Sequence, residues 1–284
     1  MLHHGLIDEA SAIAGRIVDL RRAIHAEPEL GLHTPRTRDK VRAALAHLPL
    51  EWREGTATTG MVATLKGSAT PERTVLFGAH HDAWTFGGVD PGTGTTALLE
   101  VGRALGALAK TGWRPSRSIA LAFWDAEELG LVGSTEYAED QRARLQEQLV
   151  MYVNIDMYMK GRFDPGGVPS LTAFVADVAR DVPQGASTVF DQWKAAELAR
   201  LPAARRPADV SGFTPSIKAL GSGADFVPFQ DHLAVPTMAI EFIGDNGYLC
   251  GSKGLQGKVR ACGIDHESLQ PVLLAVEEVE LQHA

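Results

Sequence analysis

The sequence has few of the features that mark disulfide-rich, membrane or secreted proteins. Its two cysteines in 284 residues are too few for a disulfide framework, so Cys250 and Cys262 either pair once or stay reduced. No run approaches the roughly 18 apolar residues of a membrane-spanning helix. The first residues, MLHHGLIDEASAIAG, lack the basic start and apolar run of a signal peptide. We therefore predict a cytoplasmic protein that does not bind a membrane.

An excess of positive charge is also missing. The formal net charge is −8, and the 27 lysines and arginines are scattered, which argues against nucleic-acid binding. The loop GGVDPGTGTT lacks the Gly-Lys-Ser/Thr ending of a phosphate-binding loop, and there is no G-x-S-x-G nucleophile motif. A hydrophobic content of 45% is ordinary for a globular protein, and the length fits one large α/β domain.

Short apolar runs alternate with helical patterns along the chain. The patterns predict strands over 61–67, 73–80, 118–126, 149–156 and 236–244, and helices over 7–26, 34–48, 128–139 and 169–181, from 95, and from 267. Residues 183–215 predict loops around a short helix. Near-continuous apolar strands between helices indicate an α/β fold with a mostly parallel central sheet and helices on both faces. Since no flexible linker separates two cores, we expect residues 1–284 to form a single domain.

Imidazole and carboxylate side chains follow the predicted strands. In an open parallel sheet, ligands bind beyond the carboxyl ends of the strands, so we expect these side chains to converge on one edge. The candidates are His80, His81, Asp82, Asp90, Asp125, Glu127, Glu128 and Asp156. Their convergence predicts a metal site.

The residue types indicate which metal and which roles. Imidazole and carboxylate ligands without thiolates suit a catalytic zinc site with open positions, and manganese or cobalt could also occupy it. The adjacent carboxylates of Glu127 and Glu128 are costly to bury without a cation or a proton, so we expect one to bind metal and the other to handle a proton. Asp82 fits the role of the carboxylate that fixes the tautomer of His80.

From about residue 75 to 223 the chain resembles the di-zinc exopeptidase family, which includes aminopeptidases and glutamate carboxypeptidases. The blocks that carry the resemblance occur in the family's order: GAHHDAWTFGGVDPGTG, TGWRPSRSIALAFWDAEELGLVGSTEYAE, YVNID and LGSGADF. The resemblance implies a zinc-exopeptidase-like three-layer sandwich of the phosphorylase/hydrolase type. It also implies two zinc ions per chain, and the glutamate carboxypeptidase branch is the most similar.

The resemblance also implies a role for each matched residue. His80 and Asp156 would bind one zinc ion, Glu128 and a distal histidine the other, and Asp90 would bridge the two. Glu127 would be the general base. Because the family has a cis peptide after the bridging Asp, and because X–Pro bonds lower the cost of the cis form to about 0.5–1 kcal/mol, we predict that Asp90–Pro91 is cis.

The distal histidine has no direct counterpart at the aligned position of this sequence. Direct alignment from Gly247–Tyr248 places Gly251 at the ligand position. The next histidine, His266 in GIDHESLQPV, precedes the predicted terminal helix, as the family ligand does, so we predict His266 as the fifth ligand. The competing interpretation makes DHESL a helix cap without a ligand.

A second resemblance covers residues 17–67. The segment IVDLRRAIHAEPELGLHTPRTRDKVRAAL followed by TGMVATLKG is similar to the start of the aminoacylase-type amidohydrolases, in which this stretch is mainly structural. The chain therefore combines the opening of one family with the catalytic body of the other. We expect a single catalytic domain without the inserted lid, protease-associated or helical dimerisation domains of these relatives.

The resemblance predicts an enzyme, a zinc-dependent exopeptidase or amidohydrolase that acts on a small peptide or an acyl-amino acid. Aminopeptidase-like action is favoured, because Met238, Ile240 and Glu241 occupy the region where the glutamate-specific branch has carboxylate-binding arginines. The alternatives are N-acyl-amino-acid hydrolysis or carboxypeptidase action, and a catalytically silent binding protein. The oligomeric state, monomer or weak homo-oligomer, is left open. Trp84, Trp124 and Trp193 are predicted to pack in the core rather than to line a cleft.

Overall fold

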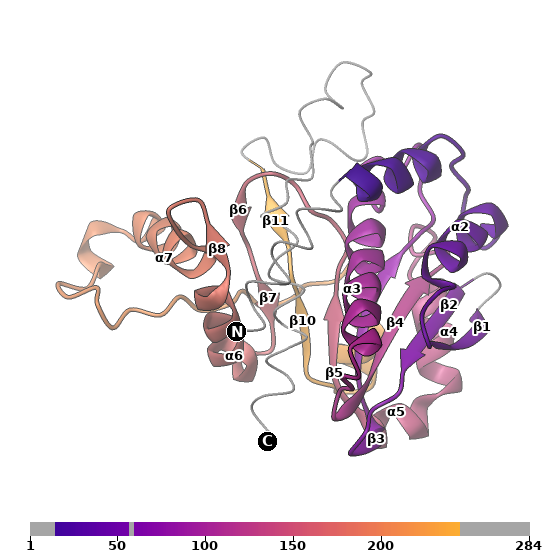
Figure 1. Ribbon diagram of the computed structural model, residues 1–284. Helices are drawn as coiled ribbons and strands as arrows, with labels where there is room; N and C mark the ends of the chain where they lie inside the picture. The colour runs from indigo at the N-terminus through magenta and orange to yellow at the C-terminus, as the bar shows by residue number, and fades with distance from the viewer. Residues whose placement is uncertain (1–14, 57–59, 245–284) are drawn as a thin grey trace.

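Four parallel strands form the centre of a seven-stranded sheet in the computed structural model, which describes residues 15–56 and 60–244. The strand order is β1 (Glu51–Thr56), β2 (Gly60–Leu65), β4 (Arg117–Trp124), β3 (Thr70–His80), β5 (Leu149–Asn154), β10 (Thr237–Ala239) and β7 (Gly166–Gly167). Strands β4, β3, β5 and β10 run parallel, whereas β1, β2 and β7 pair antiparallel. The predicted mostly parallel sheet is confirmed (Figure 1).

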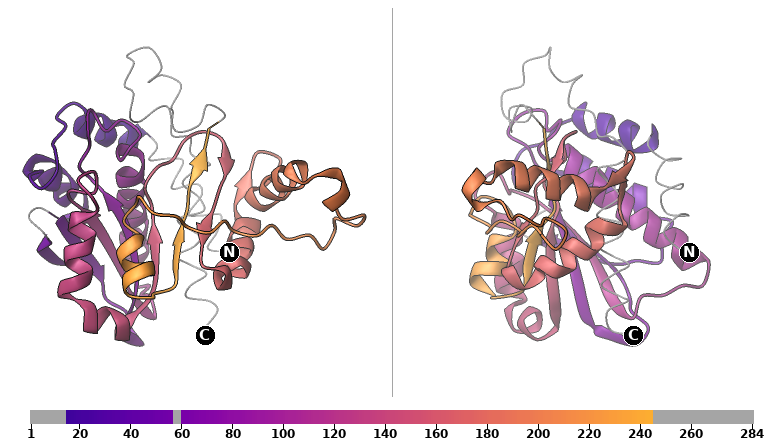
Figure 2. Two further views of the ribbon diagram at one scale, coloured as in Figure 1. Left: turned by 180° about the vertical axis from the view of Figure 1, so that it is seen from behind. Right: turned by 90° about the vertical axis from the view of Figure 1, so that its left-hand side faces the viewer.

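Helices cover both faces of the sheet. Helices α2 (Pro35–Leu45) and α3 (Gly92–Lys110) pack on one face with the helical residues 15–25, and α4 (Val132–Asp140) and α5 (Arg142–Gln148) pack on the other (Figure 2). Successive β3 side chains point to opposite faces, so Phe77 joins the core beneath α3 and Leu76 joins the core beneath α4 and α5. Burial on both faces explains the continuous apolar runs of the central strands.

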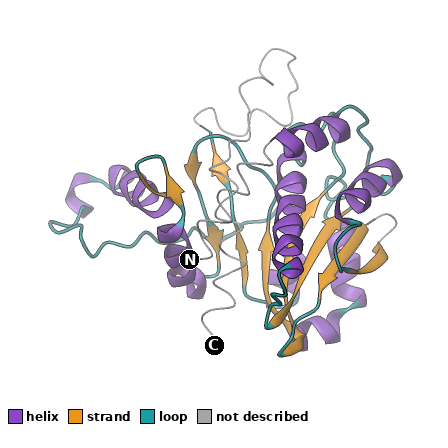
Figure 3. Cartoon of the chain, viewed as in Figure 1, coloured by secondary structure: helices purple, strands orange, loops and turns teal. Residues whose placement is uncertain are grey.

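Helices α6 (Thr172–Asp181) and α7 (Val189–Arg200) lie beyond the β7 edge of the sheet (Figure 3). Helix α7 begins with a capping box, in which the Thr188 hydroxyl accepts a hydrogen bond from the Asp191 N–H at 3.1 Å and the Asp191 carboxylate accepts one from the Thr188 N–H at 3.2 Å. Its Trp193 packs edge-on against Phe163 of β6 (Arg162–Phe163). The short helix predicted within 183–215 is thus a capped helix of twelve residues.

The structure divides two predicted elements. The strand predicted over 236–244 becomes β10 in the main sheet and β11 (Phe242–Ile243), which pairs with β6 in a separate sheet. The helix predicted over 128–139 begins only at Val132, because Leu131 has a left-handed backbone with φ 60°, and α5 follows it. The short elements are β8 (Pro183–Gln184), β9 (Ser187–Thr188), η1 (Pro169–Leu171), η2 (Ala203–Arg205) and η3 (Pro228–His232). Residues 7–14 and the helix predicted from 267 lie outside the described residues.

Candidate metal centre

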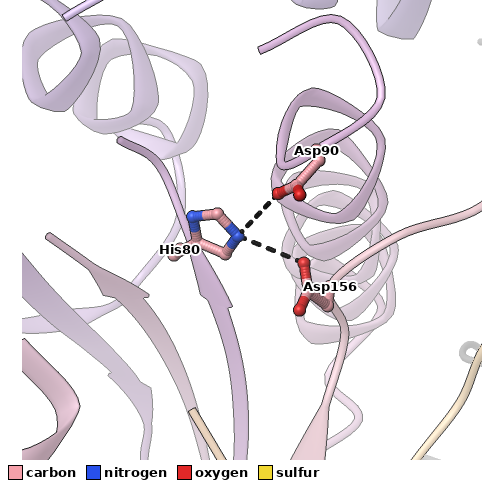
Figure 4. Close-up of side chains that lie close together, drawn as sticks. All are labelled: His80, Asp90 and Asp156. Carbon is pink, nitrogen blue, oxygen red and sulfur yellow. Dashed lines mark hydrogen bonds and ion pairs between the residues drawn. The ribbon is translucent and has the colours of Figure 1, made fainter. Parts of the chain in front are cut away.

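The register of the central strands brings His80 and Asp156 together. Strands β3 and β5 pair Gly78 with Asn154, so His80 and Asp156, each two residues further along, lie at the same level of the sheet edge. The Nε2 atom of His80 lies 3.1 Å from Asp156 Oδ1 and 3.1 Å from Asp90 Oδ1 (Figure 4). One ligand atom from each of these three residues lies within 4.8 Å of the others.

Asp82 organises the turn that carries the two glutamates. Its carboxylate accepts hydrogen bonds from the Glu127 N–H at 3.0 Å and the Glu128 N–H at 3.3 Å. The turn follows β4 and includes Ala126, whose φ of 54° is in the left-handed region. Such a backbone is strained for a residue with a Cβ, and these two hydrogen bonds help to hold it. Glu127 Oε2 thereby lies 3.9 Å from His80 Nε2.

Asp82 also orients the imidazole of His80. The Nδ1–H of His80 donates to the Asp82 backbone carbonyl at 3.1 Å, and the Asp82 carboxylate lies 3.5 Å from the same nitrogen. This arrangement directs Nε2 toward Asp90 and Asp156, where its lone pair is available to a metal ion.

The first turn of α3, which follows the loop with Asp90, is hydrogen-bonded to residues at and beyond the carboxyl ends of β3 and β5. The hydroxyl of Thr95 donates to the His80 carbonyl, and the hydroxyl of Thr93 accepts from the Tyr158 N–H at 2.9 Å. Gly94 lies so close to the backbone of Asp156 that an added Cβ would overlap its carbonyl oxygen. The Asp90–Pro91 peptide bond is cis, as predicted.

The segment before α2 is hydrogen-bonded to the loops that follow β3 and β4. The Glu29 carbonyl accepts a hydrogen bond from the Ala83 N–H at 3.3 Å, and the Gly31 carbonyl accepts one from the Ala126 N–H at 3.1 Å. The buried Thr34 hydroxyl contacts His81 Nε2 at 2.6 Å, which holds the residue next to His80. These contacts give the segment a structural part in the site.

The carboxylates of the site strongly perturb one another. Burial raises the pKa of Glu127 to about 9, and the pKa of Glu128 to about 7 with the help of the Asp90 charge. Burial opposes a charge on His80, but the carboxylates of Asp156, Asp82 and Asp90 still raise its pKa well above the ordinary value. Without a cation these groups therefore retain protons that isolated side chains would have released.

The donor set fits a divalent cation. Asp90 Oδ1 is buried and faces His80 Nε2 at 3.1 Å, but it accepts no hydrogen bond within the part of the chain that the structure describes. A cation at this point would satisfy that oxygen and offset the charges of the neighbouring carboxylates. One imidazole with carboxylates and no thiolate is a donor set that zinc accepts in catalytic sites.

The remaining predicted residues differ in outcome. His266 and both cysteines lie outside the described residues. Glu128 accepts a hydrogen bond from the Trp84 N–H at 3.2 Å, beside the three-residue cluster. Trp124 and Trp193 are buried as predicted, but Trp84 is 59% exposed, so its assignment to the core is wrong. Trp84 lies on the loop after β3, where the neighbouring Ala83 is buried but the indole is directed to solvent.

Two carboxylates near the site, one buried and one half-buried, were not predicted as functional. Asp225, in the LGSGADF block, is buried, and burial raises its pKa to about 7. Glu241 lies two residues beyond Ala239, which pairs with Asn154, so it shares the level of Asp156. Burial raises the pKa of Glu241, and Lys218 lies 3.4 Å from its carboxylate. Only the LGSGADF motif pointed to Asp225, and the register that locates Glu241 is not visible in the sequence.

No helix among residues 15–56 and 60–244 is long and apolar enough to cross a membrane.

Comparisons with known proteins place this geometry in a family. The chain is 35% identical over 205 residues to the aminopeptidase NAALADL1 of Mus musculus, a match that covers 70% of this chain and 26% of that protein. It is 36% identical over 182 residues to the probable glutamate carboxypeptidase VP8 of Zea mays, with 63% and 24% covered. The chain thus spans about a quarter of the length of these curated relatives.

A solved structure supports the fold. The LapA aminopeptidase of Legionella pneumophila superposes with a TM-score of 0.68 over 98% of this chain and 74% of that one, at 12% identity. The family model described as peptidase family M28 matches residues 61–249, which include every predicted site residue except His266. The resemblance of residues 17–67 to amidohydrolases stays a prediction. The chain belongs to peptidase family M28.

Proposed function

We propose that this chain is a zinc-dependent exopeptidase that cleaves an amide bond near a free terminus of a small peptide. The observation that carries the proposal is the convergence of His80, Asp90 and Asp156 from three separate segments, with the Glu127 carboxylate 3.9 Å from His80 Nε2. The peptidase names of the M28 relatives support the same activity. Residues 1–284 would form a single catalytic domain.

We further propose two metal ions. His80 and Asp156 would hold one, Glu128 and His266 the other, and Asp90 would bridge them. Zinc is the expected ion, with manganese or cobalt as substitutes. When bound, the metal would polarise the scissile carbonyl and acidify the attacking water.

Glu127 acts as the general base. Its pKa of about 9 in the metal-free site arises from burial first and from neighbouring charges second, and a bound cation favours its ionised form. Glu127 then accepts a proton from the attacking water and returns it to the leaving amine. Asp82 acts as a positioning residue, because it orients His80 and holds the backbone N–H groups of both glutamates.

Aminopeptidase-like action is the preferred direction. Met238 and Ile240 are buried apolar residues, and Glu241 adds a carboxylate at the level of Asp156. An acidic wall suits a free α-amino group better than a free carboxylate. Lys218 offsets part of this charge, since it pairs with Asp164 at 2.6 Å and with Glu241 at 3.4 Å.

The test combines metal analysis with a substrate screen. We expect two zinc equivalents per chain by mass spectrometry and hydrolysis of aminoacyl anilides in preference to N-acyl amino acids. A His266→Gln variant should bind one equivalent fewer, and a His232→Gln variant, altered at an exposed histidine, serves as its control. Wild-type protein that binds no metal would contradict the proposal. Preferential cleavage of N-acyl amino acids would contradict aminopeptidase-like action and favour an amidohydrolase.

No contact among the described residues favours N-acyl-amino-acid hydrolysis or a catalytically silent binding protein. Carboxypeptidase action is the second candidate, since one relative is a probable glutamate carboxypeptidase. A small peptide stays the proposed partner. The cytoplasmic location and the monomeric or weakly oligomeric state stay predictions.

A further inference from the structure

A cavity lies toward the amino ends of the parallel strands, at the other end of the sheet from the metal centre. It has a volume of about 300 Å³ and lies on the face that α4 and α5 cover. Its floor includes Thr64, Thr74, Ser118 and Ala120, from β2, β3 and β4. Ser118 and Ala120 lie near the amino end of β4, whereas the metal centre lies at the carboxyl ends of the parallel strands. Because these side chains are small, the two helices do not fill the space above the sheet.

The walls of this cavity are apolar on one side. Val62, Leu76, Leu145 and Leu149 belong to the core beneath α4 and α5, and each also lines the cavity. Trp52 of β1 adds a half-buried indole. Binding sites for small molecules combine such an apolar lining with a few placed polar groups, and their volume begins at about 300 Å³.

The charged residues of the lining are mainly cations. Arg53, Lys66 and Arg144 line the cavity together with a single carboxylate, that of Glu51. Lys66 pairs with Glu51 at 3.1 Å, and Arg53 pairs with Asp140, outside the lining, at 2.6 Å. An excess of positive charge at this point is unusual in a chain with a formal net charge of −8.

Arg144 differs from the other two cations. Its guanidinium donates hydrogen bonds to the Tyr137 hydroxyl at 2.9 Å and to Gln141 Oε1 at 3.0 Å, and both of these acceptors are neutral. Within residues 15–56 and 60–244 no carboxylate pairs with Arg144. A planar guanidinium with donors to spare is the group that proteins use to bind a carboxylate through two hydrogen bonds.

We propose that this cavity binds a small organic carboxylate, whose anionic group pairs with Arg144 and whose apolar body lies on Val62, Leu76 and Leu145. The Tyr137 hydroxyl, which accepts from Arg144, has its own proton available for the second carboxylate oxygen. The site is separate from the metal centre, and the proposal does not depend on the proposed peptidase activity.

The test titrates the zinc-loaded chain with 4-phenylbutanoate by isothermal calorimetry. We expect saturable binding that weakens at least about tenfold in Arg144→Gln, since one charge-assisted pair contributes more than about 1.4 kcal/mol. The matched control is Arg142→Gln, which removes an exposed arginine of the same helix outside the lining. Its affinity should equal that of the wild type. The uncharged 4-phenylbutan-1-ol should bind more weakly than 4-phenylbutanoate to the wild type and to Arg142→Gln, and this preference should be lost in Arg144→Gln.

Two further measurements locate the ligand. Thr64→Leu should fill part of the cavity and weaken binding without removing the arginine. Trp52→Phe should abolish any change in tryptophan fluorescence that the ligand causes. Equal affinity in Arg144→Gln and wild type would overturn the proposal, as would the absence of saturable binding to wild type at millimolar concentration. Binding that requires zinc would assign the ligand to the metal centre and would also overturn it.

Discussion

The two ends of the parallel sheet carry opposite kinds of charge. At the carboxyl ends, the carboxylates of Asp90, Glu127 and Asp156 surround the imidazole of His80. The pKa values of Glu127 and His80 are both raised well above their ordinary values. Toward the amino ends, three cations and one carboxylate line a cavity, and among the described residues no carboxylate pairs with Arg144. One end therefore requires a cation, and the other is suited to an anion.

The difference shows how one sheet produces two sites by different means. The metal centre is formed by register, because parallel pairing aligns the residues that follow each strand. The cavity results from the small volume of side chains such as Ala120, which leave space between the sheet and helices α4 and α5. The predictions below test how independent the two ends are.

The largest effect is expected for Glu127→Gln. The amide keeps the shape of the side chain but cannot accept the proton, so kcat should fall by about 10²–10⁴-fold while the zinc content is unchanged. Steady-state kinetics with an aminoacyl anilide and metal analysis provide the two measurements. Glu128→Gln, altered at a proposed ligand, should instead lose metal, and retained activity in Glu127→Gln would refute the assignment of the base.

A smaller loss is expected for Asp82→Asn. The variant replaces one of the two carboxylate oxygens that hold the N–H groups of Glu127 and Glu128 by an amide NH₂. Zinc affinity or activity should fall by about 10–100-fold, as is typical for residues that orient metal ligands. Zinc affinity is measured by competition with a chelator. The control is Asp177→Asn, which changes an exposed aspartate on α6 that pairs with Arg180, and an equal loss there would remove the positional argument.

Gly94→Ala tests the close approach of α3 to β5. The added methyl group would overlap the Asp156 carbonyl, so the helix must shift at a cost of about 1–3 kcal/mol in unfolding free energy. Urea unfolding measures the cost. Gly212→Ala, where nothing lies within 4 Å of the added carbon, should cost much less. Equal stability of the two variants would show that α3 does not limit the geometry of the site.

The pH dependence of the metal-free chain should have a defined sign. The pKa values of Glu127, Glu128 and Asp225 lie at about 9, 7 and 7, above those of the unfolded chain, so the folded state binds more protons. Stability should therefore fall as the pH rises from about 6.5 to about 9. His81, whose pKa burial lowers to about 4, acts in the opposite direction only below about pH 6.5. Thermal unfolding measures the trend, and saturating zinc should remove most of it.

The smallest effect is expected at the cation-rich end. Arg144→Gln removes no ion pair within the described residues, so stability should change by no more than about 0.5 kcal/mol and peptidase activity should be unchanged. Thermal unfolding and anilide kinetics test this expectation. A clear loss of activity would show that the two ends are coupled.

Several features of the site were accessible from the sequence, because they follow from local rules. A buried parallel strand predicts that the residues after it lie at the sheet edge. This rule indicates from the sequence alone that His80, Asp90 and Asp156 lie near one another. The cis Asp90–Pro91 bond followed from the family resemblance and from the chemistry of X–Pro peptides. The exposed position of Trp84 did not follow, since apolarity alone does not distinguish a loop from a core.

The sequence by itself determined the α/β class, the order of the strands along the chain and the set of candidate ligands, because side-chain periodicity and strand ends are properties of short segments. Only the tertiary structure decided which atoms meet. Three such contacts depend on register and on side-chain volume across distant strands. They are the hydrogen bonds of Asp82 to a turn 45 residues away, the level of Glu241 beside Asp156 and the hydrogen bond of Arg144 to the Tyr137 hydroxyl. These contacts result from the packing of the whole sheet, so no single segment of the sequence specifies them.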